Sequence, residues 1–186
     1  MKRAFLAGLA GLLIAPGTSS ANPLKSIYTT LELKSCKPTQ RRADGRTWLC
    51  PGLDGYPVRV ADGDQHSFVS IGRNAERHRA ATQTVKPLNT IFNGKSGRAT
   101  IEWRFVRKSG KPVPFATILR YFTTGPLEKG QTLVVTRIAP AESCHVAYVD
   151  AIANPGAIAI ARRVADDTAR SFDCRREPTI EGSGKP

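Results

Sequence analysis

The 186-residue chain lacks the sequence patterns of the common metal and catalytic sites. Its four cysteines include no C-x-x-C pair and its three histidines are scattered, which argues against metal ligation. There is no G-x-S-x-G, the motif that presents a serine nucleophile on a strand-to-helix turn. We therefore predict no metal, no cofactor and no catalytic residue, and we favour a protein that is not an enzyme.

Long apolar runs are also missing, except for one at the N-terminus that is too short to cross a membrane. Lys2 and Arg3 precede the apolar stretch Ala4–Ile14, and the small residues Ser19–Ala21 follow it. This order is typical of a secretory signal peptide, whereas a spanning helix needs about 20 apolar residues. We predict a signal peptide over the first 21 residues, a mature chain from Asn22 without a transmembrane segment, and a periplasmic or secreted protein.

Acidic residues are scarce beside basic ones, with 15 Asp and Glu against 28 Lys and Arg and a formal net charge of +13. Such a chain attracts anionic partners, which outside the cytoplasm include lipid headgroups, lipopolysaccharide phosphates and wall carboxylates. Nucleic acid is not expected as a partner because the protein is predicted to be exported. A solvated basic surface without a partner is an equally weighted alternative.

Short apolar or alternating segments bounded by turns predict a mainly antiparallel β structure. We expect one α+β domain over residues 22–176, built as an antiparallel sheet or partial barrel, followed by a disordered polar tail over 177–186. The stretch 73–97 has no clear periodicity. The expected strands are Ser26–Ser35, Tyr56–Ala61, His66–Ile71, Arg98–Arg107, Val113–Thr123, Thr132–Ile138 and Ser143–Ile152.

One helix is predicted over Pro155–Asp173, with Asn154 as its N-cap. Its apolar face is made mostly of small residues, so we expect the helix to pack closely on the sheet. The residues of this face are Ala157, Ala161, Val164, Ala165, Thr168 and Phe172.

The four cysteines of an exported chain are predicted to form two disulfides. The extended segment Cys144–Ile152 is roughly 27 Å long and a helix over Pro155–Cys174 is about 29 Å long. A helix that folds back along the strand therefore returns Cys174 to Cys144, which leaves Cys36 to pair with Cys50.

The strand that begins at Cys144 is apolar on both faces. If Cys144 faces the helix, strict alternation places Val146 and Tyr148 on the same side, with His145 and Val149 opposite. A strand that is apolar on both faces is covered on both sides, so we expect it near the middle of the sheet.

Three segments resemble a family of small exported proteins of alphaproteobacteria. They are Cys50–Val58 (C-P-G with G-Y-P-V), Ala116–Arg120 (A-T-I-L-R) and Cys144–Asp150 (C-H-V-A-Y-V-D). The resemblance extends over most of the mature chain, and the last segment is its most specific part. It implies export and two disulfides, and it supplies no catalytic residue.

Arg73, Arg77 and Arg79 lie close together in the aperiodic stretch and are the candidate anion-binding residues. Guanidinium groups bind phosphate or carboxylate in a bidentate manner, although clustered charge is also typical of a solvated loop. His145 is interpreted as a hydrogen-bonded interior residue rather than a catalytic base.

Glu102 lies two residues before Arg104 on a predicted strand and is interpreted as half of an ion pair. A glycosidase would need a second placed carboxylate, for which Asp62 and Asp64 are candidates. The sequence D-G-D, however, is first a turn signal.

The favoured function is a non-catalytic binding domain for an anionic envelope component or a protein partner. The alternatives are a hydrolase without a familiar motif and a protein like the lysozyme inhibitors. The positive charge disfavours the second alternative, because lysozymes of the common type are themselves basic.

Overall fold

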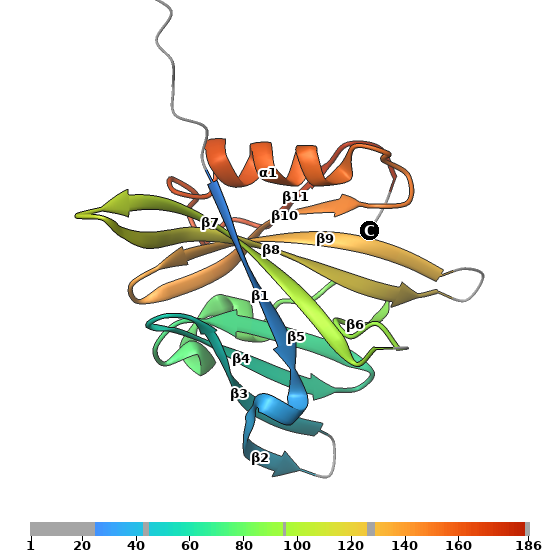
Figure 1. Cartoon of the computed structure of the whole chain (residues 1–186). Coiled ribbons are helices and arrows are strands. Elements are labelled where there is room, and N and C mark those ends of the chain that lie inside the picture. The colour runs from blue at the N-terminus through green and yellow to red at the C-terminus, as the bar shows by residue number, and fades with distance from the viewer. Residues whose placement is uncertain (1–24, 43–44, 95, 126–128, 185–186) are drawn as a thin grey trace, which may run out of the picture.

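The computed structural model describes residues 25–42, 45–94, 96–125 and 129–184. The predicted signal peptide and the predicted first mature residue, Asn22, lie outside these described residues. The described part of the chain forms three layers: a helix, a central seven-stranded sheet, and an outer four-stranded sheet (Figure 1). No helix within it is long and apolar enough to cross a membrane.

The central sheet has the order β1-β7-β8-β9-β10-β11, with β6 paired to β8, and the outer sheet has the order β2-β3-β4-β5. Neighbouring strands are antiparallel except β10 and β11. The central strands are β1 (Lys25–Glu32), β6 (Leu88–Thr90), β7 (Arg98–Lys108), β8 (Lys111–Thr124), β9 (Lys129–Ala139), β10 (Glu142–Asp150) and β11 (Thr179–Glu181). The outer strands are β2 (Lys37–Arg42), β3 (Gly45–Leu53), β4 (Tyr56–Gly63) and β5 (His66–Ile71). The helices are η1 (Leu33–Ser35), η2 (Ala75–Arg77), η3 (Arg79–Thr82) and α1 (Ala157–Asp167).

The predicted α+β class, a β structure with one C-terminal helix, is confirmed, and both sheets are open rather than closed into a barrel. The strands expected at 56–61 and 66–71, at 98–107 and 113–123, and at 132–138 and 143–152 pair as the antiparallel hairpins β4–β5, β7–β8 and β9–β10. The β2–β3 hairpin was not expected, because its polar, basic residues show little apolar alternation. Both predicted disulfides, Cys36–Cys50 and Cys144–Cys174, are present.

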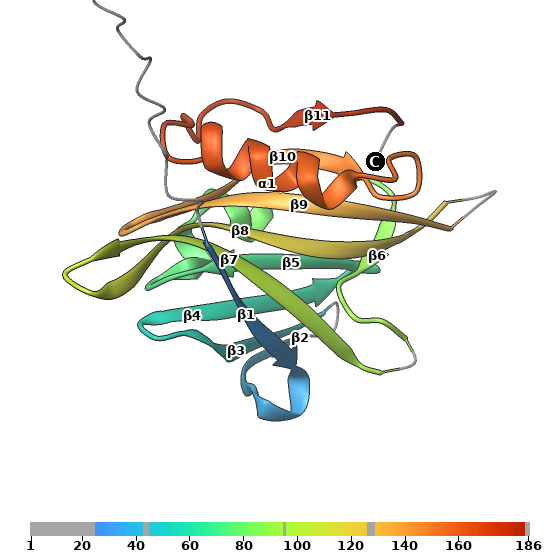
Figure 2. The same ribbon diagram turned by 45° about the horizontal axis from the view of Figure 1, so that its top comes forward.

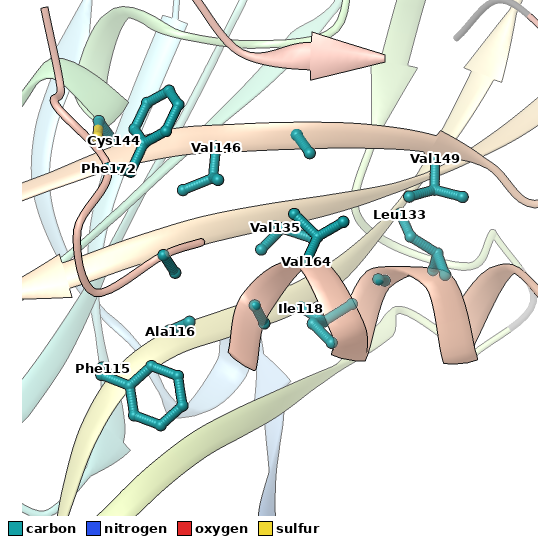
Figure 3. Close-up of a cluster of buried hydrophobic side chains, with 14 of the residues drawn as sticks. Phe115, Ala116, Ile118, Leu133, Val135, Cys144, Val146, Val149, Val164 and Phe172 are labelled. Carbon is teal, nitrogen blue, oxygen red and sulfur yellow. The ribbon is translucent and has the colours of Figure 1, made fainter. Parts of the chain in front are cut away.

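Two separate cores lie on opposite faces of the central sheet. One fills the space between the two sheets and includes Trp103 and Tyr121, both almost completely buried. The other lies under α1, where Val164 and Phe172 approach Val135 and Val146 (Figure 3). The alanines of the helix face let α1 sit close to the strands, as its small-residue pattern predicted.

A β-bulge in β10 overturns the predicted alternation of that strand. The register between β10 and β9 shifts between His145 and Ala147, so Ala147 packs under α1 after Val146 has done so. A bulge adds one residue and thereby exchanges the faces of all later residues. Tyr148 consequently points into the core between the sheets, and Val149 into the core under α1. The strand is covered on both faces by the helix and the outer sheet, although only the short β11 separates it from the sheet edge.

Helix α1 is shorter than predicted, because it ends at Asp167 rather than Asp173. Thr168 is therefore exposed and Ala169 takes the expected buried place, while Phe172 is buried beyond the helix end. The chain must turn there because the disulfide brings the Cα atom of Cys174 to 5.7 Å from that of Cys144.

The predicted N-cap is also wrong, since Gly156 occupies that position without a side-chain cap. The side chain of Asn154 instead donates hydrogen bonds to the carbonyl oxygens of Asp150 (2.8 Å) and Ser183 (2.6 Å), and its Oδ1 accepts one from the Ser183 N–H (2.9 Å). These bonds hold the C-terminal segment against the turn before α1.

The segment after Glu177 also differs from the expected disordered tail. Within residues 177–184, β11 pairs in parallel with β10 and forms one edge of the central sheet (Figure 2). The polar composition of the segment predicted disorder, but the outer edge of β10 supplies backbone hydrogen-bonding groups and Asn154 supplies a side-chain anchor.

Candidate ligand-binding cleft

The inner face of the outer sheet changes from apolar to polar toward one end. Trp48, Val60 and Val69 lie directly opposite one another across three strands and pack into the core between the sheets. Residues two positions apart on a strand share a face, so the next row continues this surface. That row consists of Arg41, Arg46, Asp62 and Ser67, which are directly opposite one another on β2, β3, β4 and β5.

This polar row forms one side of a cleft of about 1040 Å³ at the open end of the two-sheet sandwich. The end of β8, the short β6 and η1 form the other side, in the region where Figure 1 labels β6 and where β1 leads down to η1. Apolar side chains contribute much of the wall, namely Leu33, Trp48, Leu88 and Phe122. Ligand sites commonly combine such apolar walls with a few polar groups.

One rim of the cleft is held by hydrogen bonds within the chain. The buried Asn89 side chain accepts a hydrogen bond from the Ser67 N–H (3.1 Å) and donates to the carbonyl oxygens of Val85 and Pro87 (both 3.0 Å). The ring of His66 is bonded to the carbonyl oxygens of Asp64 (2.7 Å) and Lys86 (3.3 Å). Asn89 and His66 therefore serve to join β5 to the segment before β6, and the cleft is pre-formed.

The half-buried Asp62 is the acidic group of the polar row. The hydroxyl of Ser67 donates a hydrogen bond to its Oδ1 at 2.7 Å. Burial raises the pKa of the Asp62 carboxyl, and the bond from Ser67 opposes part of that effect. Asp64, at the tip of the same hairpin, also lines the cleft and is exposed.

Arg41 and Arg46 are the cationic groups of the row, and both side chains are exposed. Within the described residues, neither guanidinium has a hydrogen bond or ion pair. Like charges directly opposite one another on neighbouring strands are destabilising, so this pair carries a cost that a bound anion would relieve. The two groups are placed to bind an anion at the mouth of the cleft.

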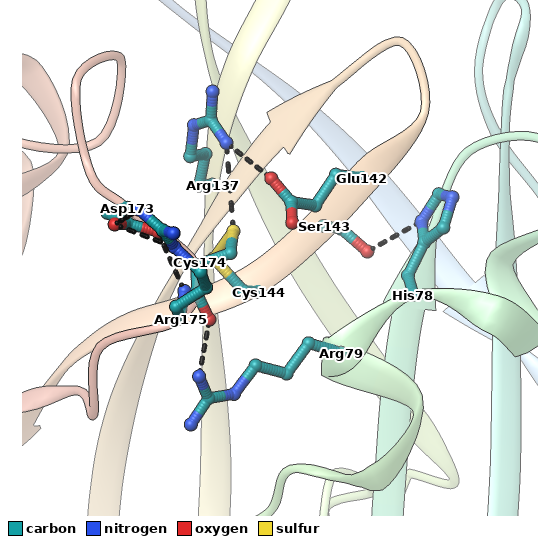
Figure 4. Close-up of polar contacts among 9 residues, drawn as sticks. All are labelled: His78, Arg79, Arg137, Glu142, Ser143, Cys144, Asp173, Cys174 and Arg175. Atoms are coloured by element: carbon teal, nitrogen blue, oxygen red, sulfur yellow. Dashed lines mark hydrogen bonds and ion pairs between the residues drawn. A yellow bond between two sulfur atoms is a disulfide. The ribbon is translucent and has the colours of Figure 1, made fainter.

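The three predicted anion-binding arginines differ in their contacts within the chain. Arg79 donates hydrogen bonds to the carbonyl oxygen of Cys174 and to the carboxylate of Glu177, and its side chain points toward the C-terminal segment (Figure 4). Arg73 and Arg77 are exposed, and Arg77 lies 4.0 Å from the carboxylate of Glu76. Arg79 thus has partners within the chain, and anion binding by Arg73 and Arg77 stays a prediction.

His145 is an interior residue, as predicted. Its Nδ1 lies 3.0 Å from the hydroxyl of Tyr148, and burial lowers its pKa to about 3. The bulge leaves its N–H without a strand partner, and the side chain of Gln83 accepts that bond at 2.9 Å. A neutral ring enclosed in this way does not reach the cleft.

Glu102 also forms the predicted ion pair, but on the other side of the central sheet from the cleft. Its carboxylate lies 3.7 Å from Arg104 and 2.7 Å from Arg162 of α1. Arg104 is bonded in turn to Asp166 at 2.8 and 2.6 Å. Glu102 and Asp62 therefore do not form the carboxylate pair of a glycosidase.

One further contact, between a buried serine and a buried histidine, resembles the nucleophile and base of a catalytic site. The hydroxyl of Ser143 lies 3.0 Å from Nδ1 of His78 (Figure 4) and accepts a bond from the Ile71 N–H at 3.3 Å. Ser143 is fully buried, so no substrate reaches it, and the contact serves to join β5 to β10. In the described part of the chain, no three His, Cys, Asp or Glu side chains are grouped to hold a metal ion.

Comparisons with protein-family models, with curated proteins and with solved structures give no match. The function must therefore be inferred from the cleft itself. The sequence analysis did not identify Arg41, Arg46 and Trp48 as site residues. Arg46, Trp48 and Cys50 are each two residues apart, so on a strand they share one face. This spacing is the sequence pattern from which Arg46 and Trp48 could have been placed on the inner face.

Proposed function

We propose that the protein is a non-catalytic binding domain that takes an anionic ligand of the cell envelope into the cleft between its two sheets. The observation that carries this proposal is the pair of directly opposed arginines, Arg41 and Arg46, at the mouth of a pre-formed cleft, neither of which has a partner among the described residues. Guanidinium groups bind carboxylate and phosphate oxygens in a bidentate manner.

Several further features support the same proposal. The two disulfides favour a location outside the cytoplasm, where the N-terminal signal pattern and the resemblance to exported proteins also place the chain. The cleft has two arginines beside two aspartates. It is therefore not the acidic groove by which a basic lysozyme would be bound, and a lysozyme inhibitor is not favoured.

The proposal is tested by nuclear magnetic resonance titration with galacturonate and with hexose phosphate. We expect shifts in residues of the cleft that weaken steeply with salt, because exposed charges are screened over about 8 to 10 Å near physiological ionic strength. R41Q/R46Q should abolish binding. K108Q/K111Q, which removes the same charge at the distant tip of the β7–β8 hairpin, should not.

The R73Q/R77Q variant separates the two candidate anion surfaces. If it abolishes binding and R41Q/R46Q does not, the ligand binds the surface around Arg73 and η2, and the cleft proposal is wrong. Equal effects of R41Q/R46Q and the distant lysine variant would show that net charge alone attracts the anion.

A glycoside hydrolase is the second candidate, favoured by the presence of both Asp62 and Asp64 in the cleft. A carboxyl whose pKa is raised by burial can act as the general acid, while a second carboxylate acts as base or nucleophile. Release of reducing ends from an acidic glycan, lost in both D62N and D64N, would favour the enzyme. Binding without release favours the binding domain.

A further inference from the structure

A second hollow of about 740 Å³ adjoins the cleft. Leu33 of η1 and Thr90 of β6 line both spaces, so the two hollows are neighbours at this end of the sandwich, and we refer to them together as the groove. The second hollow lies over the segment between β6 and β7 and contains Phe92. Sites for small molecules have volumes of about 300 to 1,000 Å³. The volume of the cleft is at the upper end of this range, and that of the second hollow lies in its upper half. A phosphate ion or a single sugar would leave most of the groove empty.

Among the described residues that line the second hollow, the charged side chains are paired with one another. The carboxylate of Glu32 is bound by Lys34 at 2.8 Å and by Arg98 at 2.5 Å. The hydrogen bond from Lys34 and the charges of both cations hold the pKa of Glu32 below its usual range. Such a fixed, ionised carboxylate accepts hydrogen bonds from hydroxyl groups, and together with Lys34 and Arg98 it forms a cluster with a formal net charge of +1.

Half-buried aromatic side chains are spaced along the groove, with Trp48 and Phe122 in the cleft and Phe92 in the second hollow. An aromatic face packs well against the C–H face of a sugar ring. Carboxylates also lie along the groove at Asp62 and Glu32, where they suit sugar hydroxyls. An acyl chain would have to desolvate the polar row Arg41–Arg46–Asp62–Ser67.

From these features we infer that the ligand is a linear anionic oligosaccharide whose chain runs from the cleft into the second hollow. The inference rests on the proposed function, and it adds that the ligand is a chain of several sugar units. The acidic group of one unit binds Arg41 and Arg46. Further units extend past Leu33 and Thr90 toward Phe92. A polynucleotide is disfavoured because the chain carries the N-terminal pattern of an exported protein.

The test measures the affinity of the mature protein for galacturonate oligomers of one to six units by calorimetry or resonance titration at low salt. We expect affinity to rise with length until both hollows are filled and then to level off. Affinity that does not change with length would overturn the inference and leave the proposed function standing. Absence of binding at every length would overturn both.

Gly94 offers a variant that blocks the second hollow without disturbing a core. A Cβ atom built at Gly94 meets nothing within 4 Å, and the same holds at Gly156 at the start of α1, which provides the matched control. G94L, which adds bulk without adding an aromatic face, should reduce the affinity for the hexamer roughly three- to tenfold, the effect of losing one aromatic contact, and leave the monomer unaffected. G156L should change neither.

Two outcomes would contradict this assignment. If G94L keeps the full length dependence, the chain leaves the cleft in another direction. If a single-stranded oligonucleotide of matched charge binds more tightly than the hexamer, the groove is selective for a polyphosphate and the sugar chain is wrong.

Discussion

Acidification should destabilise the protein through His145. The imidazole is enclosed between the sheets, and desolvation lowers its pKa from 6.5 to about 3. At pH 5 the folded protein therefore holds the ring neutral, whereas the unfolded chain protonates it below about pH 6.5. Because the unfolded state binds the additional proton, the stability that is present in full above pH 6.5 is lost as the pH falls toward 3.

The size of the effect follows from this difference in proton binding. At pH 5.0 the unfolded ring is about 1.5 units below its pKa, and each unit corresponds to about 1.4 kcal/mol. We therefore expect His145 to lower the free energy of unfolding by about 2 kcal/mol between pH 7.5 and 5.0. This window lies above the ordinary carboxylate range, so Glu32 and Asp173, whose pKa values are lowered, contribute little to the change.

Urea unfolding of the wild type and of His145→Gln at both pH values tests this expectation. Glutamine retains a polar side chain but does not titrate, so the variant should lose about 2 kcal/mol less on acidification. His66→Gln, at the exposed β4–β5 hairpin, controls for removal of a histidine as such. An unchanged pH dependence in His145→Gln, or a folded-state resonance of His145 that titrates near pH 6.5, would refute the reasoning.

The remaining predictions concern stability. Replacing both cysteines of a pair by serine should lower the free energy of unfolding by about 3 kcal/mol for Cys36–Cys50 and by about 3.6 kcal/mol for Cys144–Cys174. The second loss is larger because the closed loops span 14 and 30 residues. A clearly larger loss from the shorter loop in urea melts would contradict this loop-entropy argument. Phe172→Ala should lower the free energy of unfolding by about 3 to 5 kcal/mol because it truncates a buried aromatic side chain. The control Arg163→Ala changes an exposed side chain and should lower it by about 0.5 kcal/mol or less. Similar losses in the two variants would mean that Phe172 is not packed under α1. Asp166→Asn should cost about 1.5 to 3 kcal/mol because it removes one of the two carboxylates beside the buried Arg104, which keeps Glu102 and the hydroxyl of Ser26. A neutral D166N in urea melts would show that this ion pair is not important for stability.

The sequence alone determined the features that depend on short-range patterns. Turn signals such as D-G-D at 62–64 mark where the chain reverses, and the apolar residues on either side form the strands of the hairpin. Strand and helix have fixed lengths per residue, so the return of Cys174 to Cys144 followed from counting. The small apolar face of α1 was readable for the same reason, since a helical period repeats within a few residues.

The tertiary structure decided the features in which a distant segment supplies the missing partner. The bulge at His145 needs the side chain of Gln83 to satisfy an N–H that β9 cannot reach. Likewise, β11 forms because the edge of β10 and the side chain of Asn154 lie beside an otherwise polar tail. The residues next to a segment along the chain do not reveal such distant partners. They therefore predicted regular alternation for β10 and disorder for the C-terminal segment.

The cleft belongs to this second group. Arg41, Arg46 and Asp62 come together only through strand register, and the wall that faces them is built from β6, β8 and η1. A run of arginines along the chain was visible in the sequence at 73–79, yet Arg79 there binds the C-terminal segment. Whether a charged side chain is free for a ligand depends on what the folded chain places beside it, because a partner within the protein competes with any ligand for the same hydrogen bonds.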